Sequence, residues 1–262
     1  MSGDFAARYG PWALVTGASS GIGRAFARRL AERGLNVILV ARRTERLQAL
    51  AAELTARCGV LACVVPVDLS RDDFLDIIRA ATDGLEIGLL VNSAGYSLTG
   101  PLLDADPDAL LRLFNVNGRA PLLLTRAFGP AMRARRRGGI VMVSSVVAFA
   151  ATPQWSLYAA TKAFNLLLGE GLAAELRSDG VDVLTLAPGA TRTEFFDVAG
   201  LDAGMSLPAE RVVDEALAHL GRSDVVVPGW YYRVGTLMTR LLPRSVNRAM
   251  FGRFLTGMRA EA

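Results

Sequence analysis

Long apolar runs are absent from this chain of 262 residues. No stretch approaches the ~20 consecutive apolar residues that a membrane-spanning helix needs. Residues 1–9 contain acidic and polar side chains where a signal peptide would have a continuous apolar core. We therefore expect a cytoplasmic protein.

Cysteine is scarce as well, since Cys58 and Cys63 are the only two. No cluster of cysteine and histidine accompanies them, which argues against a zinc site, and an intracellular setting disfavours a disulfide. We expect two reduced thiols and no metal centre.

Nucleic-acid-binding motifs are lacking too, although the formal net charge is +4 and the pI is near 9.5. The arginines are spread over several expected helices, and the basic run at 133–137 fits a solvated helix end. No internal repeat or low-complexity linker divides the sequence, and 52% hydrophobic residues supply a substantial core. The composition indicates one domain, residues 1–262, without a nucleic-acid partner.

Tyr158 and Lys162 are the first candidates for chemistry among the residues that are present. They lie four positions apart in an apolar run at 155–168, which predicts a buried helix with both side chains on one face. A positive charge within reach lowers the pKa of a phenol from about 10 by roughly one to three units, which would make Tyr158 a usable acid or base. Ser145 ends the strand-like run 139–143, where its hydroxyl could hold a substrate oxygen. Taken alone, the pair is also typical of a structural tyrosine beside a lysine that reaches to solvent.

A glycine-rich stretch near the N-terminus strengthens the chemical interpretation. An apolar strand is expected at 11–15 and a helix at 22–33, with Gly17, Gly21 and Gly23 around the turn that joins them. Such glycines allow a tight turn, close approach of the backbone to a pyrophosphate and close packing of helix on strand. The helix N-terminus also favours negative charge. The pattern predicts dinucleotide binding.

The end of the second expected strand, 36–41, bears on the choice of cofactor. An NAD-selective site usually has a carboxylate here for the ribose 2′-hydroxyl, but this sequence continues with Arg42 and Arg43. Arg42 can pair with a 2′-phosphate through its planar fork, and Arg24 or Arg43 could assist. Alternatively, these arginines face solvent at the start of a helix. The arrangement favours NADP(H) over NAD(H).

With Thr16-Gly17-Ala18-Ser19-Ser20-Gly21-Ile22-Gly23 and the pair Tyr158/Lys162, the sequence resembles the classical short-chain dehydrogenase/reductase (SDR) family. The resemblance extends to about Pro228. It implies a single-domain, Rossmann-type α/β fold with a doubly wound parallel sheet of about seven strands and helices on both faces. The remaining strands are expected at 61–66, 87–91, 181–186 and 224–227, and the other helices at 43–57, 71–82 and 106–132.

The same resemblance implies a catalytic tetrad that needs no metal. Tyr158 transfers the proton, and Lys162 lowers the pKa of the phenol and holds the nicotinamide ribose. Ser145 positions the carbonyl oxygen, and Asn117 holds a water that links the lysine to solvent. The cofactor-binding residues that the resemblance implies are Gly17, Ser19, Ser20, Gly21, Ile22, Gly23, Arg42, Arg43, Asp68, Leu69, Asn92, Ala94, Gly95, Tyr158, Lys162, Pro188, Gly189, Thr191 and Thr193.

Some of these positions leave alternatives open. Asp68 lies at the adenine ring in the family, but it could also cap the expected helix at 71–82. Asn92 is expected to tie neighbouring strands together, and Ser93 replaces the second Asn of the family's Asn-Asn-Ala-Gly. Backbone groups near 190–191 are expected on the nicotinamide carboxamide.

Residues 194–207 lack clear periodicity, and the segment 192–210 is interpreted as a substrate lid. The side chains that would make this lid apolar are Phe195, Phe196, Leu201 and Met205.

The last segment, 230–262, is interpreted as a helical tail that Pro243 divides in two. Its apolar stripe, with interleaved arginines, could lie on the parent domain, on a second subunit or on a membrane surface. We favour a homo-oligomer, a dimer or tetramer, with the tail packed against protein near the substrate entrance.

These interpretations combine into an NADP(H)-dependent oxidoreductase, a carbonyl reductase or alcohol dehydrogenase that acts on a small-molecule ketone or alcohol. Phe149, Trp155 and the phenylalanines of the lid indicate a mainly apolar substrate. No motif selects among steroids, acyl thioesters, retinoids, sugars and xenobiotic ketones. The alternative is a catalytically weak NADP-binding protein that responds to redox state. A lost tetrad residue would mark that alternative, and all four are present.

Overall fold

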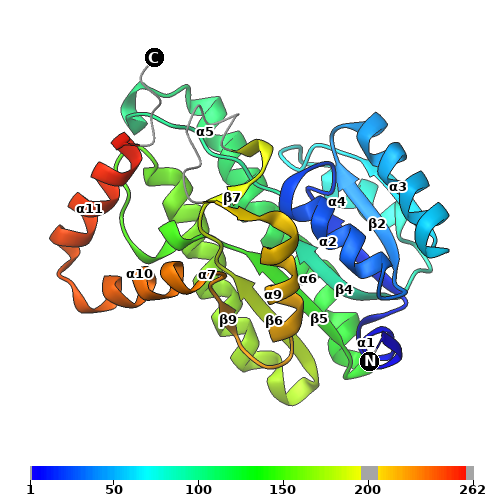
Figure 1. The fold of residues 1–262 in the computed structure, drawn as a ribbon. Coiled ribbons are helices and arrows are strands. Elements are labelled where there is room, and N and C mark those ends of the chain that lie inside the picture. The colour runs from blue at the N-terminus through cyan, green and yellow to red at the C-terminus, as the bar shows by residue number, and fades with distance from the viewer. Residues whose placement is uncertain (1, 196–205, 258–262) are drawn as a thin grey trace.

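The computed structural model describes residues 2–195 and 206–257, which are built around a seven-stranded parallel sheet with helices on both faces (Figure 1). The strand order is β3-β2-β1-β4-β5-β6-β9, so the chain starts in the middle, moves to one edge, returns and moves to the other. The predicted doubly wound sheet is confirmed. The strands of this sheet are β1 (Trp12–Thr16), β2 (Asn36–Ala41), β3 (Ala62–Pro66), β4 (Ile87–Asn92), β5 (Gly138–Val143), β6 (Val181–Leu186) and β9 (Val225–Val226).

The helices follow the strands in the alternation that a parallel sheet requires. They are α1 (Ser2–Tyr9), α2 (Gly21–Ala31), α3 (Thr44–Cys58), α4 (Phe74–Ala81), α5 (Pro107–Phe114), α6 (Ala120–Arg135), α7 (Ser156–Leu176), α9 (Ala209–His219), α10 (Trp230–Leu241) and α11 (Arg244–Gly257). Shorter helical turns are η1 (Leu102–Asp104), η2 (Asn115–Arg119), η3 (Val146–Phe149) and η4 (Arg177–Asp179).

The sheet separates two apolar cores, because successive side chains of a strand point to opposite faces. In β1, Leu14 packs in the core under α4, α6 and α7, whereas Val15 packs in the core under α2, α3 and α9. Both faces are covered, so the strands read as continuous apolar runs in the sequence. This is why the runs expected at 36–41 and 181–186 coincide with β2 and β6.

The helix expected at 106–132 is interrupted, which corrects that prediction. Asp106 caps α5 through its carboxylate, and α5 ends at Phe114. One π-helical turn, η2, follows before α6 continues to Arg135. Such turns are rare and occur frequently at functional sites. Here the π turn holds Asn117 at 0% exposure in the interior.

The first helix, α1, has no counterpart among the expected elements. Its last residue, Tyr9, is buried and donates a hydrogen bond of 2.6 Å to Asp182 near the start of β6. Arg8 donates to the same carboxylate through Nε at 2.6 Å and Nη2 at 2.8 Å. These bonds fix α1 against the amino ends of the strands, away from the glycine turn.

The basic run at 133–137 is more than a solvated helix end. Arg133 pairs with Asp179 at 3.0 Å, and Arg137 pairs with Glu86. These ion pairs attach the end of α6 to η4 and to the segment before β4.

The tail helices α10 and α11 extend from the side of the molecule opposite to α3 (Figure 1). On their inner side, Tyr232 and Phe251 pack against a small apolar cluster that contains Trp155 and Tyr158. On the outer side of α10, a stripe at helical spacing is exposed, formed by Trp230 (73%), Val234 (52%), Leu237 (56%) and Leu241 (71%).

Within the described part of the chain, no helix combines the length and apolar character needed to cross a membrane.

Candidate active site

The carboxyl ends of the central strands open onto a cavity of about 340 Å³. This is the edge where a doubly wound sheet binds its ligands, next to the point at which the strand order reverses. Nearly all of the predicted site residues line it, namely Gly17, Ser19, Ser20, Gly21, Ile22, Gly23, Arg42, Arg43, Asp68, Leu69, Ala94, Gly95, Ser145, Tyr158, Lys162, Pro188, Gly189, Thr191 and Thr193. Asn92 and Asn117 do not.

The glycine turn after β1 has the shape that a dinucleotide requires. Gly17 has a φ of +69°, and a Cβ there would come within 2.9 Å of Ala94 Cα. A Cβ at Gly23 would overlap the carbonyl oxygen of Gly17, so this glycine lets α2 begin directly against β1. The first N–H groups of α2 therefore lie at the cavity wall, where they suit a pyrophosphate.

Two arginines after β2 line the cavity and occupy different environments. Arg43 is exposed at the start of α3, as the alternative interpretation expected, but its Nε and Nη2 also donate to Ser19 Oγ at 3.2 and 3.0 Å. Its Nη1 donates to Glu194 at 2.8 Å. Arg42, in contrast, makes no hydrogen bond or ion pair with any residue that the structure describes. Its guanidinium is therefore available to an anionic ligand.

Asp68, after β3, does not cap a helix, and this alternative is corrected. Helix α4 begins only at Phe74. The Oδ1 atom of Asp68 instead accepts hydrogen bonds from the N–H and the hydroxyl of Ser70, at 2.9 and 2.8 Å. The carboxylate shapes its own turn at the cavity edge.

Asn92, at the end of β4, does not line the cavity, and its assignment to the cofactor stays a prediction. Its Nδ2 donates to Thr125 Oγ1 at 3.3 Å and contacts Met142 Sδ at 3.2 Å. The side chain thus joins β4 to α6 and to β5, which is the tie between neighbouring elements that the sequence predicted.

Tyr158 and Lys162 lie on one face of α7 and are buried, at 6% and 4% exposure. The ammonium Nζ donates to the carbonyl oxygen of Val143 at 2.9 Å and lies 5.7 Å from the centre of the Tyr158 ring. The hydroxyl of Ser144 donates to the backbone oxygen of Lys162 at 2.6 Å. This bond holds α7 at the end of β5.

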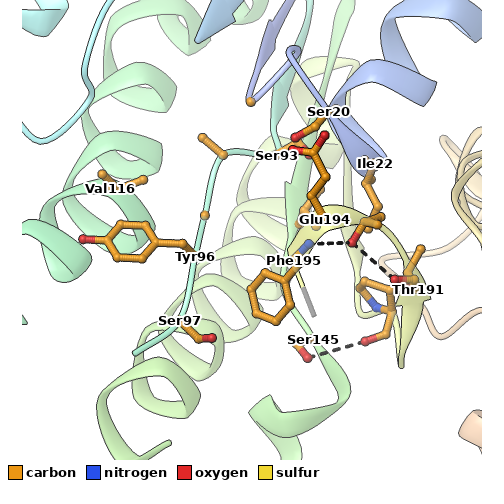
Figure 2. Close-up of a pocket in the computed structure, with 18 of the residues that line it drawn as sticks. Ser20, Ile22, Ser93, Tyr96, Ser97, Val116, Ser145, Thr191, Glu194 and Phe195 are labelled. Atoms are coloured by element: carbon orange, nitrogen blue, oxygen red, sulfur yellow. Dashed lines mark hydrogen bonds between the residues drawn. The ribbon is translucent and has the colours of Figure 1, made fainter. Parts of the chain in front are cut away.

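Ser145 follows Ser144 at the end of β5, and its hydroxyl makes no hydrogen bond to the backbone of α7. Its Oγ accepts a long hydrogen bond of 3.4 Å from Val147 N–H and donates one of 3.5 Å to the carbonyl oxygen of Pro188 (Figure 2). Both bonds are weak by their length, so the hydroxyl can exchange them for a substrate oxygen.

The pKa of Tyr158 is shifted in the opposite direction to the sequence-based prediction. Burial raises the pKa of this phenol well above its ordinary value, and a hydrogen bond with Ser145 opposes the shift only in part. Burial also lowers the pKa of Lys162 to about 8. For both groups, desolvation of the ionised form is the main cause of the shift. Tyr158 is therefore held as a neutral phenol, which is the form that donates a proton.

Asn117 lies behind Gly95 rather than in the cavity wall. Its Oδ1 accepts from Tyr96 N–H at 3.1 Å, and its Nδ2 donates to Tyr96 O at 2.9 Å. A Cβ on Gly95 would lie 3.2 Å from both Asn117 Oδ1 and Lys162 Nζ, so the amide and the ammonium are neighbours. The amide fixes the chain after β4, and its part in a water relay stays a prediction.

The loop after β6 is closed by the tail helix α10. The N–H of Ala190 donates to the Tyr232 hydroxyl at 2.8 Å, and its carbonyl oxygen accepts from Leu207 N–H at 2.9 Å. The ring of Tyr232 lies against Gly189, where any Cβ would overlap it. The backbone groups of Ala190 are thus engaged within the protein. The expectation that backbone groups near 190–191 hold the carboxamide stays a prediction.

The described ends of the segment 192–210 form a small second sheet, β7 (Thr191–Arg192) beside β8 (Leu207–Pro208). Thr193 lies over the glycine turn, since a Cβ on Gly21 would be 2.9 Å from Thr193 Cγ2. Three side chains assigned to the lid fall outside the described residues: Phe196, Leu201 and Met205.

Several further residues line the cavity that were not predicted as site residues, among them Tyr96, Ser97, Val116, Glu194 and Tyr232. Tyr96 directly follows the Asn92–Gly95 tetrad, so extending that motif by one position would have found it. Val116 lies on the π turn and Tyr232 on the tail, and no sequence pattern indicates either one. Figure 2 shows Tyr96 and Val116 on the wall opposite Phe195 and Thr191.

Residues 11–204 match the family model described as short chain dehydrogenase. The chain is 35% identical over 261 residues to a very-long-chain 3-oxoacyl-CoA reductase of Anas platyrhynchos, covering 94% of this chain and 83% of the relative.

Solved structures agree with this match. A structure of a 7beta-hydroxysteroid dehydrogenase gives a TM-score of 0.89 at 30% identity, covering 94% of this chain and 98% of the other. A short-chain dehydrogenase from Sphingobium yanoikuyae in complex with NADPH gives 0.78 at 37% identity, covering 83% and 86%. The chain therefore belongs to the short-chain dehydrogenase family and is an oxidoreductase with a nicotinamide cofactor that acts on hydroxyl or carbonyl groups.

Proposed function

We propose that this protein is an NADP(H)-dependent carbonyl reductase, and in reverse an alcohol dehydrogenase, for a mainly apolar ketone or alcohol. The observation that carries the proposal is the meeting of Ser145, Tyr158 and Lys162 in one cavity, beside an apolar cluster that includes Val147 and Trp155.

The protein's own part in this reaction is to move one proton and to hold one oxygen. When bound, the nicotinamide supplies a hydride to the carbonyl carbon, or accepts it from the alcohol. In reduction, the phenol of Tyr158 gives its proton to the carbonyl oxygen, and the Lys162 ammonium stabilises the phenolate that remains. The Ser145 hydroxyl donates a hydrogen bond to the same substrate oxygen. Asn117 supports the chain beside Lys162, where solvent returns the proton.

The preference for an apolar substrate rests on the aromatic residues around Tyr158. The ring centres of Trp155 and Phe195 lie 5.1 and 5.5 Å from that of Tyr158. These rings place apolar surface beside the phenol, which suits a hydrocarbon substrate better than a hydrated polyol. The names of the relatives, a very-long-chain acyl reductase and a hydroxysteroid dehydrogenase, also refer to substrates with large apolar parts.

The preference for NADP(H) rests on the charge at the end of β2. Arg42 has no partner among the described residues, and no carboxylate occupies the position where NAD-selective sites bind the ribose. The related enzyme of known structure that was solved with NADPH supports the same choice.

The homo-oligomer is also a proposal, with the exposed stripe of α10 as the contact surface. The inner side of the tail already packs on the active-site cluster through Phe251, which leaves the outer stripe without a neighbour in the described part of the chain. Exposed apolar surfaces of this kind commonly mark subunit contacts. The membrane surface stays the alternative to be tested.

The test is NADPH oxidation by the wild-type protein and by Tyr158→Phe, against carbonyl compounds that range from steroids and acyl thioesters to hydroxylated sugars. We expect turnover of the apolar compounds, and a loss of about 10²–10⁴-fold in Tyr158→Phe with unchanged NADPH affinity. A near-wild-type rate in Tyr158→Phe would contradict the mechanism, and faster turnover of sugars would contradict the substrate class. NADPH binding without turnover of any compound would support the redox-responsive alternative.

A further inference from the structure

Glu194 joins the start of the segment 192–210 to the helix that follows β2. Its Oε2 accepts from Arg43 Nη1 at 2.8 Å, and its Oε1 accepts from Arg46 Nη1 at 2.5 Å. The two ion pairs share one carboxylate, whose pKa is held below its ordinary value first by Arg43 and then by Arg46. The carboxylate is therefore ionised at neutral pH.

The place of this ion pair coincides with the place proposed for the 2′-phosphate. The other two donors of Arg43, Nε and Nη2, both bind Ser19 Oγ in the glycine turn. Arg43 is thus fixed at the cofactor side of the cavity, beside Arg42, and Glu194 lines the same cavity. The Glu194 carboxylate therefore pairs with Arg43, the arginine to which NADP(H) would bring its 2′-phosphate.

The next residue, Phe195, covers the catalytic end of the same cavity. Its ring centre lies 5.5 Å from that of Tyr158 and 6.3 Å from that of Trp155. Its N–H donates to Thr193 Oγ1 at 3.3 Å. Figure 2 shows the Glu194 carboxylate and the Phe195 ring leaving the chain in different directions, the first beside Ser20 in this view and the second toward Ser145. Adjacent residues therefore contact the two ends of the pocket.

From these contacts we propose that Glu194 competes with the 2′-phosphate of the cofactor for Arg43, so that a nucleotide with this phosphate releases Glu194 and Phe195 from the pocket. The inference rests on the proposed NADP(H) function and extends it. Glu194 is then a residue that determines cofactor specificity, because NAD(H) has no group that can replace its carboxylate.

The charges and exposures make this exchange favourable. A phosphate carries more charge than a carboxylate and offers more acceptor oxygens, so it is the stronger partner for an arginine pair. The side chains of Arg43, Arg46 and Glu194 are 42%, 48% and 42% exposed, and ion pairs at this exposure are weak. The 2′-phosphate can therefore displace the Glu194 carboxylate from Arg43 at a small cost in free energy. When no phosphate is bound, the ion pairs of Glu194 with Arg43 and Arg46 remain formed.

The experiment compares 2′,5′-ADP with 5′-AMP, which differ only in the 2′-phosphate, by isothermal titration calorimetry. The variant is Glu194→Gln, which keeps the shape and removes the charge. The matched control is Glu45→Gln, because Glu45 is an exposed carboxylate in the first turn of α3 that makes no hydrogen bond or ion pair with a described residue. We expect 2′,5′-ADP to bind Glu194→Gln roughly threefold to tenfold more tightly than wild type, 5′-AMP to change less than twofold, and Glu45→Gln to behave as wild type.

The outcomes separate the inference from the function on which it rests. Equal tightening of both nucleotides, no tightening, or the same gain in Glu45→Gln would overturn competition at Arg43 while leaving the oxidoreductase in place. A wild-type chain that binds neither nucleotide would overturn both.

A second measurement follows the catalytic end of the pocket. In a chain with Trp12→Phe and Trp230→Phe, Trp155 is the one tryptophan that remains, and it contacts Phe195. We expect the fluorescence of Trp155 to change when 2′,5′-ADP binds and not when 5′-AMP binds. When Glu194→Gln is added to this chain, the two nucleotides should no longer differ in their effect. An equal response to both nucleotides would contradict release by the phosphate.

Discussion

The hydroxyl of Tyr232 accepts a hydrogen bond of 2.8 Å from the backbone N–H of Ala190. This bond connects the tail helix α10 to the loop at 188–191, which lines the cavity. Burial raises the pKa of Tyr232 to about 12, so the hydroxyl stays neutral across the physiological range.

Tyr232→Phe should therefore loosen the loop at 188–191 while the ring still packs on Gly189. Ala190 is 8% exposed, and a buried N–H left without a partner costs about 1–3 kcal/mol. We expect a lower free energy of unfolding, faster amide hydrogen exchange at Ala190 and weaker NADPH binding. Unchanged exchange at Ala190 would show that water replaces the hydroxyl at no cost.

Arg42→Ala should separate the two cofactors. A charged hydrogen-bonded contact to a 2′-phosphate contributes about 1.5–3 kcal/mol, so NADPH affinity should fall roughly tenfold to a hundredfold, with little change for NADH. Arg24→Ala is the comparison, because Arg24 does not line the cavity. Equal losses for NADPH and NADH in Arg42→Ala would mean that this arginine contacts another part of the cofactor.

Lys162 should make the stability of the cofactor-free protein depend on pH. The pKa of Lys162 is about 8 in the folded protein, whereas that of an unburied lysine is 10.5. Between pH 8 and pH 10.5 the unfolded chain therefore binds more protons than the folded one. Stability then rises with pH through this window, by at most about 1.4 kcal/mol per pH unit, and the burial penalty is fully present below pH 8.

Lys162→Met should remove that rise, and the measurement is urea unfolding of both proteins in steps from pH 7.5 to 9.5. The raised pKa of Tyr158 acts in the opposite direction above pH 10, which is why the range stops short of it. Parallel stability curves for the two proteins would show that the lysine is not desolvated as the structure indicates.

Leu241→Asp should disrupt the proposed contact between subunits. Leu241 is 71% exposed on the outer stripe of α10, and a charge there would be buried on association. Sedimentation analysis should show smaller species than wild type, whereas Leu103→Asp, at a 95% exposed leucine in η1, should not. An unchanged oligomer, together with wild-type binding to anionic vesicles that Leu241→Asp abolishes, would favour the membrane alternative.

The sequence was sufficient for elements whose residues act locally. Strand β2 and strand β6 are continuous apolar runs, and the glycine turn needs only the steric freedom of its own residues. Tyr158 and Lys162 share a face because they are four positions apart in one helix. For these features, spacing along the chain determines position in space.

Other features depend on contacts that periodicity does not contain. The π turn around Asn117 departs from the 3.6-residue repeat of an α-helix. The helical pattern of apolar residues at 106–132 nevertheless continues through it, so the sequence does not indicate the interruption. The bond between Tyr232 and Ala190 joins segments that no motif links. The pKa of Tyr158 depends on how completely packing excludes water, and the sequence indicated only that a positive charge was near.

Lys162 is the only lysine in the sequence. A chain with 29 basic residues has therefore placed its one side-chain amine in the interior of the site, where the ammonium is bound to Val143. An acylating reagent specific for lysine can modify this protein at a single side chain, and the rate of that modification reports how accessible the cavity is to the reagent. Any lysine-derived adduct found by mass spectrometry would locate itself at the active site without further mapping.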